Sequence, residues 1–347
     1  MLAAGDRGSD MNMYMTSFIV LYRQRFVCGL ARLSIGLLIA VLTMLSAKAQ
    51  TADPIDTVRV DTDLVNVNVS LFGRDTSKRA PTLAQKDFAI FENGVSQEIS
   101  FFASAETPFD LVLLLDLSGS TADKVDLIRK SSKHFVAAAR PGDRIAIATF
   151  TTEVGIVSLL TLDRDALAKK IDQIEKPQGG TNFWDALRFS IEHILSQSRA
   201  EHRRSAVVVM TDGVDNALPD VAGDGSTTTF DELLSVVRDS DTAVLPIYLD
   251  TEDETVKQHR GSARTFELAR ASLTQLASES GSRLYPARKI KDLNGVYEQV
   301  MSDLATVYSI GYRPTNRTRD GSWRSVSVRL IDHPDFGARA KRGYFAK

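Results

Sequence analysis

Acidic and hydroxyl side chains stand at alternate positions in the segment DLSGS, directly after an apolar run, as Asp116, Ser118 and Ser120. Two more oxygen donors occur in comparable surroundings: Thr181 in the glycine-rich segment GGTN, and Asp212 in TDG after the apolar run AVVVM. Two carboxylates and three hydroxyls, with no histidine or cysteine among them, are the hard oxygen ligands that Mg²⁺ prefers. So few charges leave a bound cation electron-poor, ready to bind an incoming carboxylate tightly. The five residues therefore predict a Mg²⁺ site, with Mn²⁺ as the alternative ion.

Each of these residues also has a simpler explanation. Aspartate and serine commonly cap helix N-termini, and a helix is expected shortly after Ser120. Thr181 stands two residues before another expected helix, and TDG is an ordinary turn sequence. Capping alone does not explain three such segments at the ends of predicted strands, and a capping role can coexist with metal binding. We therefore favour the metal site.

The elements that must position these residues lie between about residues 108 and 306, where apolar strands alternate with helical patterns. Segments such as AVVVM are apolar throughout, as expected when helices cover both faces of a parallel sheet. The two strands that flank TTEVG indicate one antiparallel edge strand. The candidate strands are 111–116, 144–150, 154–160, 205–211, 243–249 and 282–285, and the candidate helices are 123–139, 163–174, 183–198, 229–239, 264–279 and 289–305. This pattern predicts a doubly wound α/β fold, which binds ligands where loops leave the carboxyl ends of its strands.

The segments on both sides of this region have the alternating pattern that is typical of antiparallel strands. Residues 58–72 alternate apolar and polar, and a second alternating segment, 88–92, meets the turn signal Asn93-Gly94. After residue 306 the segments VYSIGY, WRSVSVRLI and ARAKRGYFA are too few to form a separate domain. We expect them to pair with the N-terminal strands, so that a small antiparallel β unit brackets the mostly parallel sheet. The predicted parts are 1–49, 50–107, 108–306 and 307–347.

The first of these parts has the features of a secretory signal peptide. The run SIGLLIAVLTMLS (residues 34–46) follows Arg23, Arg25 and Arg32, and it precedes Ala47-Lys48-Ala49, an A-x-A cleavage pattern. Cleavage after Ala49 also removes Cys28, the only cysteine, so that the mature chain has neither disulfide nor thiol chemistry. Because no apolar run of membrane-spanning length occurs later, we expect a secreted or periplasmic protein.

The charge of the chain argues against nucleic acid and anionic lipid as partners. Residues 1–49 carry five basic and two acidic side chains, so their removal changes the formal net charge from -2 to -5. A mildly acidic exported protein has little electrostatic attraction to phosphate groups. We expect a protein partner instead.

The segments DLSGS, GGTN and TDG resemble the metal-ion-dependent adhesion site of von Willebrand factor A domains, and all five positions of that pattern match. The resemblance implies that Ser118, Ser120 and Thr181 contact the metal directly or nearly so, while Asp116 and Asp212 hold it largely through waters. It also implies a partner protein whose acidic residue completes the coordination sphere.

This likeness covers roughly residues 108 to 305. The flanking segments, which include DFAIFENGVSQEISFF and YSIGYRP, resemble a bacterial VWFA-related family whose members are mostly exported. The wider resemblance therefore extends over nearly all of the mature chain.

Enzymatic alternatives fit the same residues less well. A haloacid-dehalogenase-like phosphatase also has an apolar strand that ends in aspartate, but its acid/base aspartate stands two residues later, where this chain has Ser118. No G-x-S-x-G elbow surrounds Ser118 or Ser120, and no phosphate-binding loop occurs. We expect a binding module without catalytic activity. A metal-dependent phosphohydrolase and a structural envelope module with a vestigial site are the alternatives.

Overall fold

The computed structural model describes residues 64–73, 81–119, 124–175, 179–201, 203–252, 262–289 and 292–347. All of these residues belong to one compact unit, Thr62–Lys347. The predicted signal peptide, residues 1–49, lies outside the described residues, and so does Ser120.

The centre of the fold is a six-stranded sheet with the order β10-β9-β8-β5-β6-β7. Every neighbouring pair is parallel except β6 and β7, which run antiparallel at one edge, as the sequence predicted. The strands β5, β8 and β9 are buried at every residue, in keeping with their continuous apolar sequences. The bounds are β5 Phe109–Asp116, β6 Arg144–Phe150, β7 Val154–Thr161, β8 Arg204–Thr211, β9 Thr242–Leu249 and β10 Tyr285–Ala287.

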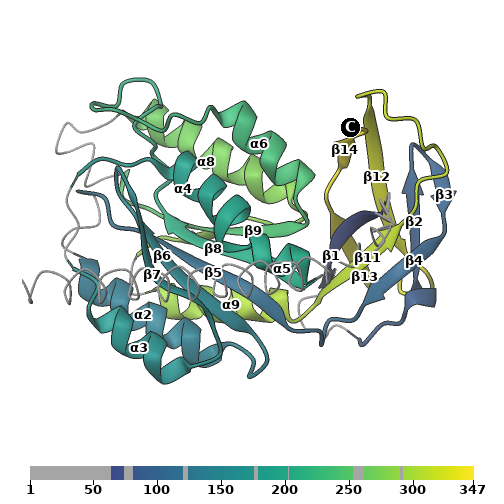
Figure 1. Ribbon diagram of the computed structural model, residues 1–347, viewed down its shortest axis with the longest axis horizontal. Helices are drawn as coiled ribbons and strands as arrows, with labels where there is room; N and C mark the ends of the chain where they lie inside the picture. Colours follow the sequence, from purple (N-terminus) through teal and green to yellow (C-terminus); the bar gives the residue numbers. More distant parts are fainter. Residues whose placement is uncertain are drawn as a thin grey trace, which may run out of the picture. The chain divides into compact units, whose positions relative to one another are not determined.

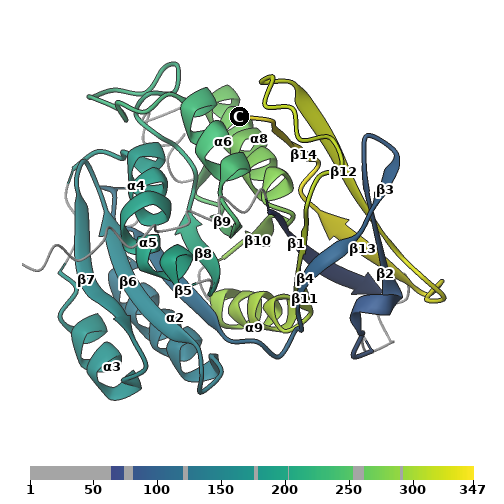
Figure 2. The same cartoon turned by 45° about the vertical axis from the view of Figure 1, so that its right-hand side comes forward.

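Helices cover both faces of this sheet (Figures 1 and 2). Alternate residues of β5 point to opposite faces, so that Leu113 packs with α2, α3 and α9, whereas Leu114 packs with α4, α6 and α8. The helix bounds are α2 Val125–Ala138, α3 Arg164–Asp172, α4 Phe183–Phe189, α5 Ser196–Ala200, α6 Phe230–Asp239, α8 Ala263–Glu279 and α9 Leu293–Leu304. The predicted fold class, a doubly wound and mostly parallel α/β sheet, is confirmed.

Two element predictions need correction. The single helix expected over 183–198 is interrupted by a π-helical turn, Ser190–Ile194, where the Leu195 N–H bonds to the Ser190 carbonyl. The Ser190 hydroxyl donates to the Ala186 carbonyl at 2.8 Å, and this competes with regular helical hydrogen bonding. The strand expected over 282–285 starts instead at Tyr285, because the preceding residues are used in turning the chain out of α8 through Gly281 (φ +80°).

Segments from both ends of the described chain build two antiparallel sheets of four strands each, with the orders β13-β1-β11-β4 and β14-β12-β2-β3. The early strand β1 pairs with the late strands β11 and β13, and β2 pairs with β12. Their bounds are β1 Val65–Gly73, β2 Phe88–Glu92, β3 Val95–Gln97, β4 Ile99–Ala103, β11 Val307–Tyr312, β12 Trp323–Leu330, β13 Phe336–Ala340 and β14 Gly343–Phe345. An antiparallel β unit made from both flanks therefore brackets the α/β region.

The two antiparallel sheets share one apolar core, in which Val67, Ile90 and Ile310 are almost completely buried. The core also encloses an ion pair between Arg324 and Glu92, with side chains 2% and 3% exposed. Glu92 accepts hydrogen bonds from the hydroxyls of Tyr312 and Tyr344, both 2.8 Å long. These bonds compensate the carboxylate for the loss of water.

Two arginines, the buried Arg204 and the half-buried Arg140, hold the segments where the chain passes between the β unit and the α/β region. Arg204, 5% exposed, donates to the carbonyls of Ser104, Thr107 and Val307, and its guanidinium lies 3.9 Å from the centre of the Phe109 ring. Arg140 donates to the carbonyls of Ala105 and Leu304. Since both arginines lie in the α/β region and bond to both crossing segments, they fix where the chain enters and leaves it.

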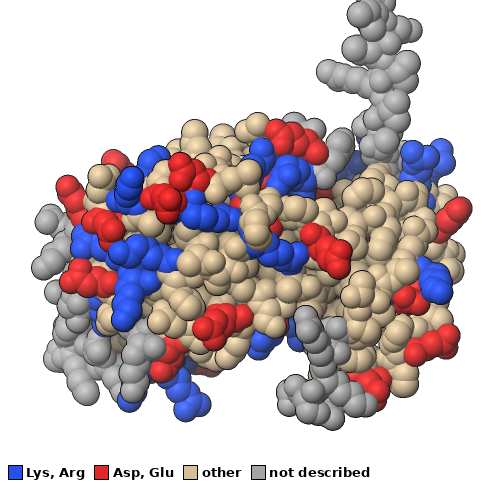
Figure 3. Space-filling model, turned by 90° about the horizontal axis from the view of Figure 1, so that it is seen from below, with Lys and Arg blue, Asp and Glu red and all other residues tan. Residues whose placement is uncertain are grey.

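The described helices and the surface charge bear on contact with membranes. None of the described helices has the length and apolar character needed to cross a bilayer. On the face seen in Figure 3, lysine and arginine side chains are interspersed with aspartate and glutamate.

Candidate metal centre

The two acids among the predicted ligands lie at the carboxyl edge of the parallel sheet. Asp116 is the last residue of β5, and Asp212 directly follows Thr211, the last residue of β8. Because β5 and β8 are neighbouring parallel strands, their carboxyl ends meet at one edge. The sheet therefore brings the two acids to the same rim.

Asp116 is completely buried and tightly held. Its Oδ1 accepts a hydrogen bond from the Ser118 N–H at 2.9 Å, and its Oδ2 accepts one from the Thr211 hydroxyl at 2.6 Å. Thr211 in turn accepts a bond from the Gly213 N–H at 2.8 Å. The carboxylate of β5 is thus oriented by the end of β8.

Burial, together with the nearby carboxylate of Asp212, raises the pKa of Asp116 to about 7. Hydrogen bonds from Ser118 and Thr211 act in the opposite direction. Two buried carboxylates that disfavour each other's charge are an arrangement that a cation relieves.

Asp212 is 3% exposed and is also oriented by two donors. Its Oδ1 accepts from the Val214 N–H at 3.1 Å, which is the turn role that TDG suggested. Its Oδ2 accepts from the Thr251 hydroxyl at 2.8 Å. Thr251 lies two residues beyond the end of β9, so a third strand end contributes to the same rim.

Thr181, 6% exposed, is tied to the loop that follows Asp212. Its N–H donates to the Asn216 side-chain oxygen at 3.1 Å, and the Asn216 N–H donates to its carbonyl at 2.9 Å. Glycine is required just before it, because a Cβ at Gly180 would lie 2.3 Å from the Asn216 side-chain nitrogen. The glycine-rich segment therefore allows Thr181 to approach the Asp212 loop closely.

Of the two predicted serines, the structure describes only Ser118. Ser118 is 2% exposed, and its side chain hydrogen-bonds to Asp116. Ser120 lies outside the described residues, so its place at the rim stays a prediction.

The structure does not support helix capping as the reason for these residues. Lys124 occupies the N-cap position of α2, and Asn182 occupies that of α4; neither makes a side-chain capping bond. Asp116, Ser118 and Thr181 are therefore not the N-caps of α2 or α4. Trp184 and Phe183, which follow Thr181, are buried in the core.

The donor set fits a small hard divalent cation. Asp116, Ser118, Thr181 and Asp212 offer only oxygen atoms, and no group of three or more histidine, cysteine, aspartate or glutamate residues with metal-site geometry occurs among the described residues. A site with two acids and several hydroxyls suits Mg²⁺, which keeps part of its water shell.

Sequence reasoning missed Thr211 and Thr251, which orient the two acids, and Asn216 and Asp215, which hold the segment around Thr181. Asp215 is completely buried and accepts from the N–H groups of Trp184, Ala217 and Ser226. The only sequence signal is that Thr211 and Thr251 stand within two residues of a strand end. Their partners lie far away along the chain, so spacing alone could not identify them.

The fold and the rim together define a class: a doubly wound α/β domain with acids and hydroxyls at the carboxyl edge of its sheet. Residues 110–255 match the von Willebrand factor type A domain family. The chain therefore contains a von Willebrand factor type A domain. The flanks lie outside the matched residues, and their resemblance to the bacterial VWFA-related family stays a prediction.

Similar proteins cover parts of the chain. An uncharacterized protein of Borreliella burgdorferi (strain ATCC 35210 / DSM 4680 / CIP 102532 / B31) is 29% identical over 138 residues, 38% of this chain and 39% of that protein. The chain thus spans about two fifths of that relative's length.

Among solved structures, proximal thread matrix protein 1 from the mussel byssus, with a zinc-occupied MIDAS motif, is 17% identical with a TM-score of 0.46. The match covers 60% of this chain and 48% of that one, so the chain spans about half of it. The vWF domain of the type V pili tip protein Mfa5 from Porphyromonas gingivalis is 15% identical with a TM-score of 0.43. That match covers 56% of this chain and 94% of the solved chain.

Proposed function

We propose that this protein is an exported binding module that attaches to a partner protein through a divalent cation, Mg²⁺, held at the rim of its parallel sheet. The observation that carries the proposal is the complete burial of Asp116 beside Asp212: burial first, and then the charge of Asp212, raise the pKa of Asp116 to about 7. Asp116, Ser118, Ser120, Thr181 and Asp212 would hold the ion. When bound, the cation supplies an electron-poor centre that attracts a carboxylate.

The remaining residues prepare this rim for binding rather than for turnover. Thr211 and Thr251 orient the two acids, and Asn216 holds the Thr181 backbone. Position 118, where a phosphatase of the type considered above needs an acid, carries a serine. We therefore assign the rim to recognition of an acidic side chain and expect no catalysis.

Calorimetric titration of the mature chain with Mg²⁺ and Mn²⁺ tests the metal. We expect binding that Asp116→Asn and Asp212→Asn weaken at least tenfold, because each removes one of two ligand charges. Asp250→Asn is the matched control: Asp250 directly follows β9 at the same rim and is exposed, but it is not a predicted ligand. Absence of binding, or an equal effect of all three changes, would overturn the proposal.

A pull-down from envelope extract tests the partner. We expect partners that are captured with Mg²⁺ and released by EDTA, and that Asp116→Asn does not capture. Capture that is insensitive to EDTA contradicts the proposal and favours a structural module with a vestigial site. Turnover of a generic phosphoester by the purified chain would favour the phosphohydrolase instead.

Export is the second part of the proposal and rests on residues 23–49 alone. We expect the protein recovered from the envelope or the medium to begin at Gln50. An N-terminus upstream of Ala49 on the recovered protein would show that the signal is retained.

A further inference from the structure

A hollow of about 370 Å³ lies where the end of α6 meets β14 and the segment 314–319. Its lining combines charged residues with an apolar wall. The charged part includes Arg238, Asp241, Arg317 and Lys341, and the apolar part includes Leu64 and Phe345. None of these residues belongs to the rim described above.

Lys341 is a buried lysine in the lining of this hollow. Its side chain is 8% exposed, and burial lowers the pKa of its ammonium group. Its ammonium group donates to the Arg238 carbonyl at 3.5 Å and lies 3.9 Å from Asp241 Oδ1. Both distances exceed the 2.7–3.2 Å of ordinary N–H···O bonds, so a group with three donors is poorly satisfied. A buried ammonium in this condition is ready to accept an anionic partner.

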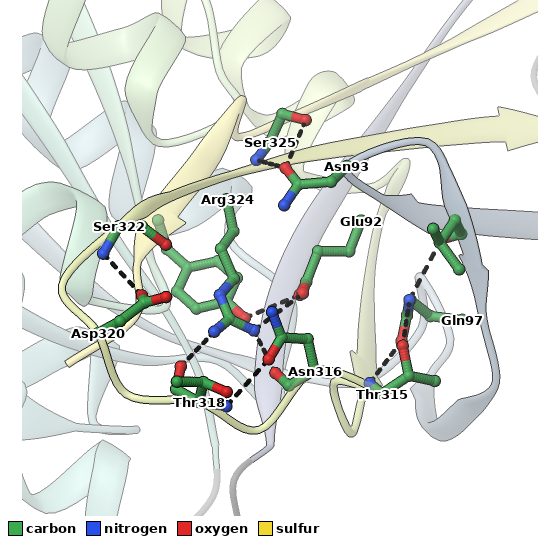
Figure 4. A network of polar contacts seen from close by, with 12 residues as sticks. Glu92, Asn93, Gln97, Thr315, Asn316, Thr318, Asp320, Ser322, Arg324 and Ser325 are labelled. Carbon is green, nitrogen blue, oxygen red and sulfur yellow. Dashed lines mark hydrogen bonds and ion pairs between the residues drawn. The ribbon is translucent and has the colours of Figure 1, made fainter.

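The wall opposite is fixed in place by the buried ion pair of the β unit. Arg324 bonds to Glu92 and also donates to the carbonyls of Asn316 and Thr318, as Figure 4 shows. Arg317 stands between these two anchored positions, lines the hollow, and makes no hydrogen bond or ion pair with another described residue. The backbone on both sides of Arg317 is therefore held in place before any ligand arrives.

The cations of the hollow outnumber its acids. The lining contains Arg238, Arg317, Arg319, Arg324, Lys341 and Lys347, against Asp239 and Asp241. Four of the cations form ion pairs with known partners: Arg238 with Glu279, Arg324 with Glu92, Lys347 with Asp239 and, at 3.9 Å, Lys341 with Asp241. The Lys341–Asp241 pair is the longest of these four, and Arg317 makes no ion pair with another described residue, so these two cations are available to an incoming anion.

We propose that this hollow is a second binding site, which takes a small organic anion whose carboxylate or phosphate pairs with Lys341 and Arg317. An inorganic ion alone would leave much of the volume to water, whereas the apolar wall fits a hydrocarbon or aromatic body. The site is separate from the metal rim and does not depend on it.

Three probes with the same ring test the anionic requirement: benzoate, phenyl phosphate and the neutral benzamide. Binding is measured by ligand-observed NMR on the mature chain in EDTA, so that the metal rim does not contribute. We expect benzoate or phenyl phosphate to bind at least tenfold more tightly than benzamide, and the better of the two identifies the anionic group. Equal binding of all three, or no binding, overturns the proposal.

Variants locate the binding. We expect Lys341→Met to abolish the preference for the anionic probes, and Arg317→Gln to weaken their binding about two- to fivefold. Arg313→Gln, an exposed arginine nearby in the chain that does not line the hollow, should change nothing. Arg317 makes no hydrogen bond or ion pair with another described residue, so we expect the Arg317→Gln variant to fold. It therefore tests the site even if Lys341→Met does not fold. Binding of the anionic probes that neither variant alters would place the anion elsewhere. Asp116→Asn, at the metal rim, should not change the binding of these probes.

Discussion

The Thr211 hydroxyl donates a 2.6 Å hydrogen bond to Asp116 Oδ2, so that the end of β8 orients the carboxylate that ends β5. The same hydroxyl accepts from the Gly213 N–H, which fixes the turn that carries Asp212. One threonine therefore couples the two acids of the candidate metal centre, although it is not itself a predicted ligand.

Replacement of Thr211 by valine tests this coupling. We expect Thr211→Val to lower Mg²⁺ affinity about 10- to 100-fold, because Asp116 loses the donor that orients it. The free energy of unfolding should fall by about 1–3 kcal/mol, since a buried acceptor and a buried N–H lose their partner. Calorimetry and urea denaturation measure the two effects, and Thr211→Ser should restore both.

The matched control is Thr242→Val at the opposite end of the sheet, where Thr242 exchanges a buried hydrogen bond with Ser205. It should reduce stability but leave Mg²⁺ affinity unchanged. An equal loss of affinity in both variants would mean that Thr211 acts only through general stability.

Replacement of Gly180 by alanine tests the close approach of Thr181 to the Asp212 loop. The added Cβ would lie 2.3 Å from the Asn216 side-chain nitrogen, so Asn216 must move and lose its bond to the Thr181 N–H. We expect Gly180→Ala to cost about 1 kcal/mol of stability and to weaken Mg²⁺ binding. Gly295→Ala in α9 is the control: an added Cβ there meets nothing within 4 Å, and stability should rise by about 0.5–1 kcal/mol. A neutral effect of Gly180→Ala on both properties contradicts the role of Asn216.

Strand and helix patterns were sufficient to predict the α/β sheet because its elements are local and strongly apolar. The run FDLVLLLD is buried at every residue, and the antiparallel edge strand follows from a short loop between two strands. The π-helical turn at Ser190 could not be predicted, since it depends on a side-chain bond to Ala186 inside an otherwise regular pattern.

Some residues of the candidate site could likewise be predicted from the sequence, and others could not. Asp116 and Asp212 could be named from sequence because strand ends of a parallel sheet share one edge. Thr251 and Asn216 could not, because each acts on a residue more than 30 positions away. Lys341 looks like an ordinary surface lysine in the sequence KRG, and only the packing of the β unit against α6 buries it.

Replacement of Arg204 by methionine tests how the β unit is joined to the α/β region. Arg204 donates to three carbonyls of the two crossing segments, and methionine keeps the apolar bulk but leaves all three without this donor. We expect a loss of about 2–4 kcal/mol in the free energy of unfolding and faster proteolysis between Ala103 and Phe109. Arg329→Met, an exposed arginine over the Phe91 ring, should change stability by less than about 0.5 kcal/mol. Similar values for the two variants would show that the crossing segments are held by other contacts.

The pH dependence of stability tests the burial of Lys341. Burial lowers the pKa of this lysine below its ordinary 10.5, and Asp241 and Asp239 oppose the shift. Arg238, Arg324 and Lys347 also face the hollow. Below the folded-state pKa of Lys341 both states carry the proton, and the folded state bears the full cost of burying the charge. As the pH rises from there towards 10.5, the unfolded chain binds more protons than the folded one, so the free energy of unfolding increases.

Lys341→Met lacks this titration and keeps the other charged groups of the hollow. We expect it to be more stable than the wild type by roughly 1 kcal/mol near neutral pH. Its advantage should shrink as the pH approaches 10.5, because the wild-type lysine becomes neutral in the folded state without cost. Urea denaturation of both proteins at several pH values, in chloride buffer without other anions, gives the difference directly. An advantage that stays constant over this range, or a variant less stable than the wild type at every pH, would mean that Asp241 already satisfies the ammonium.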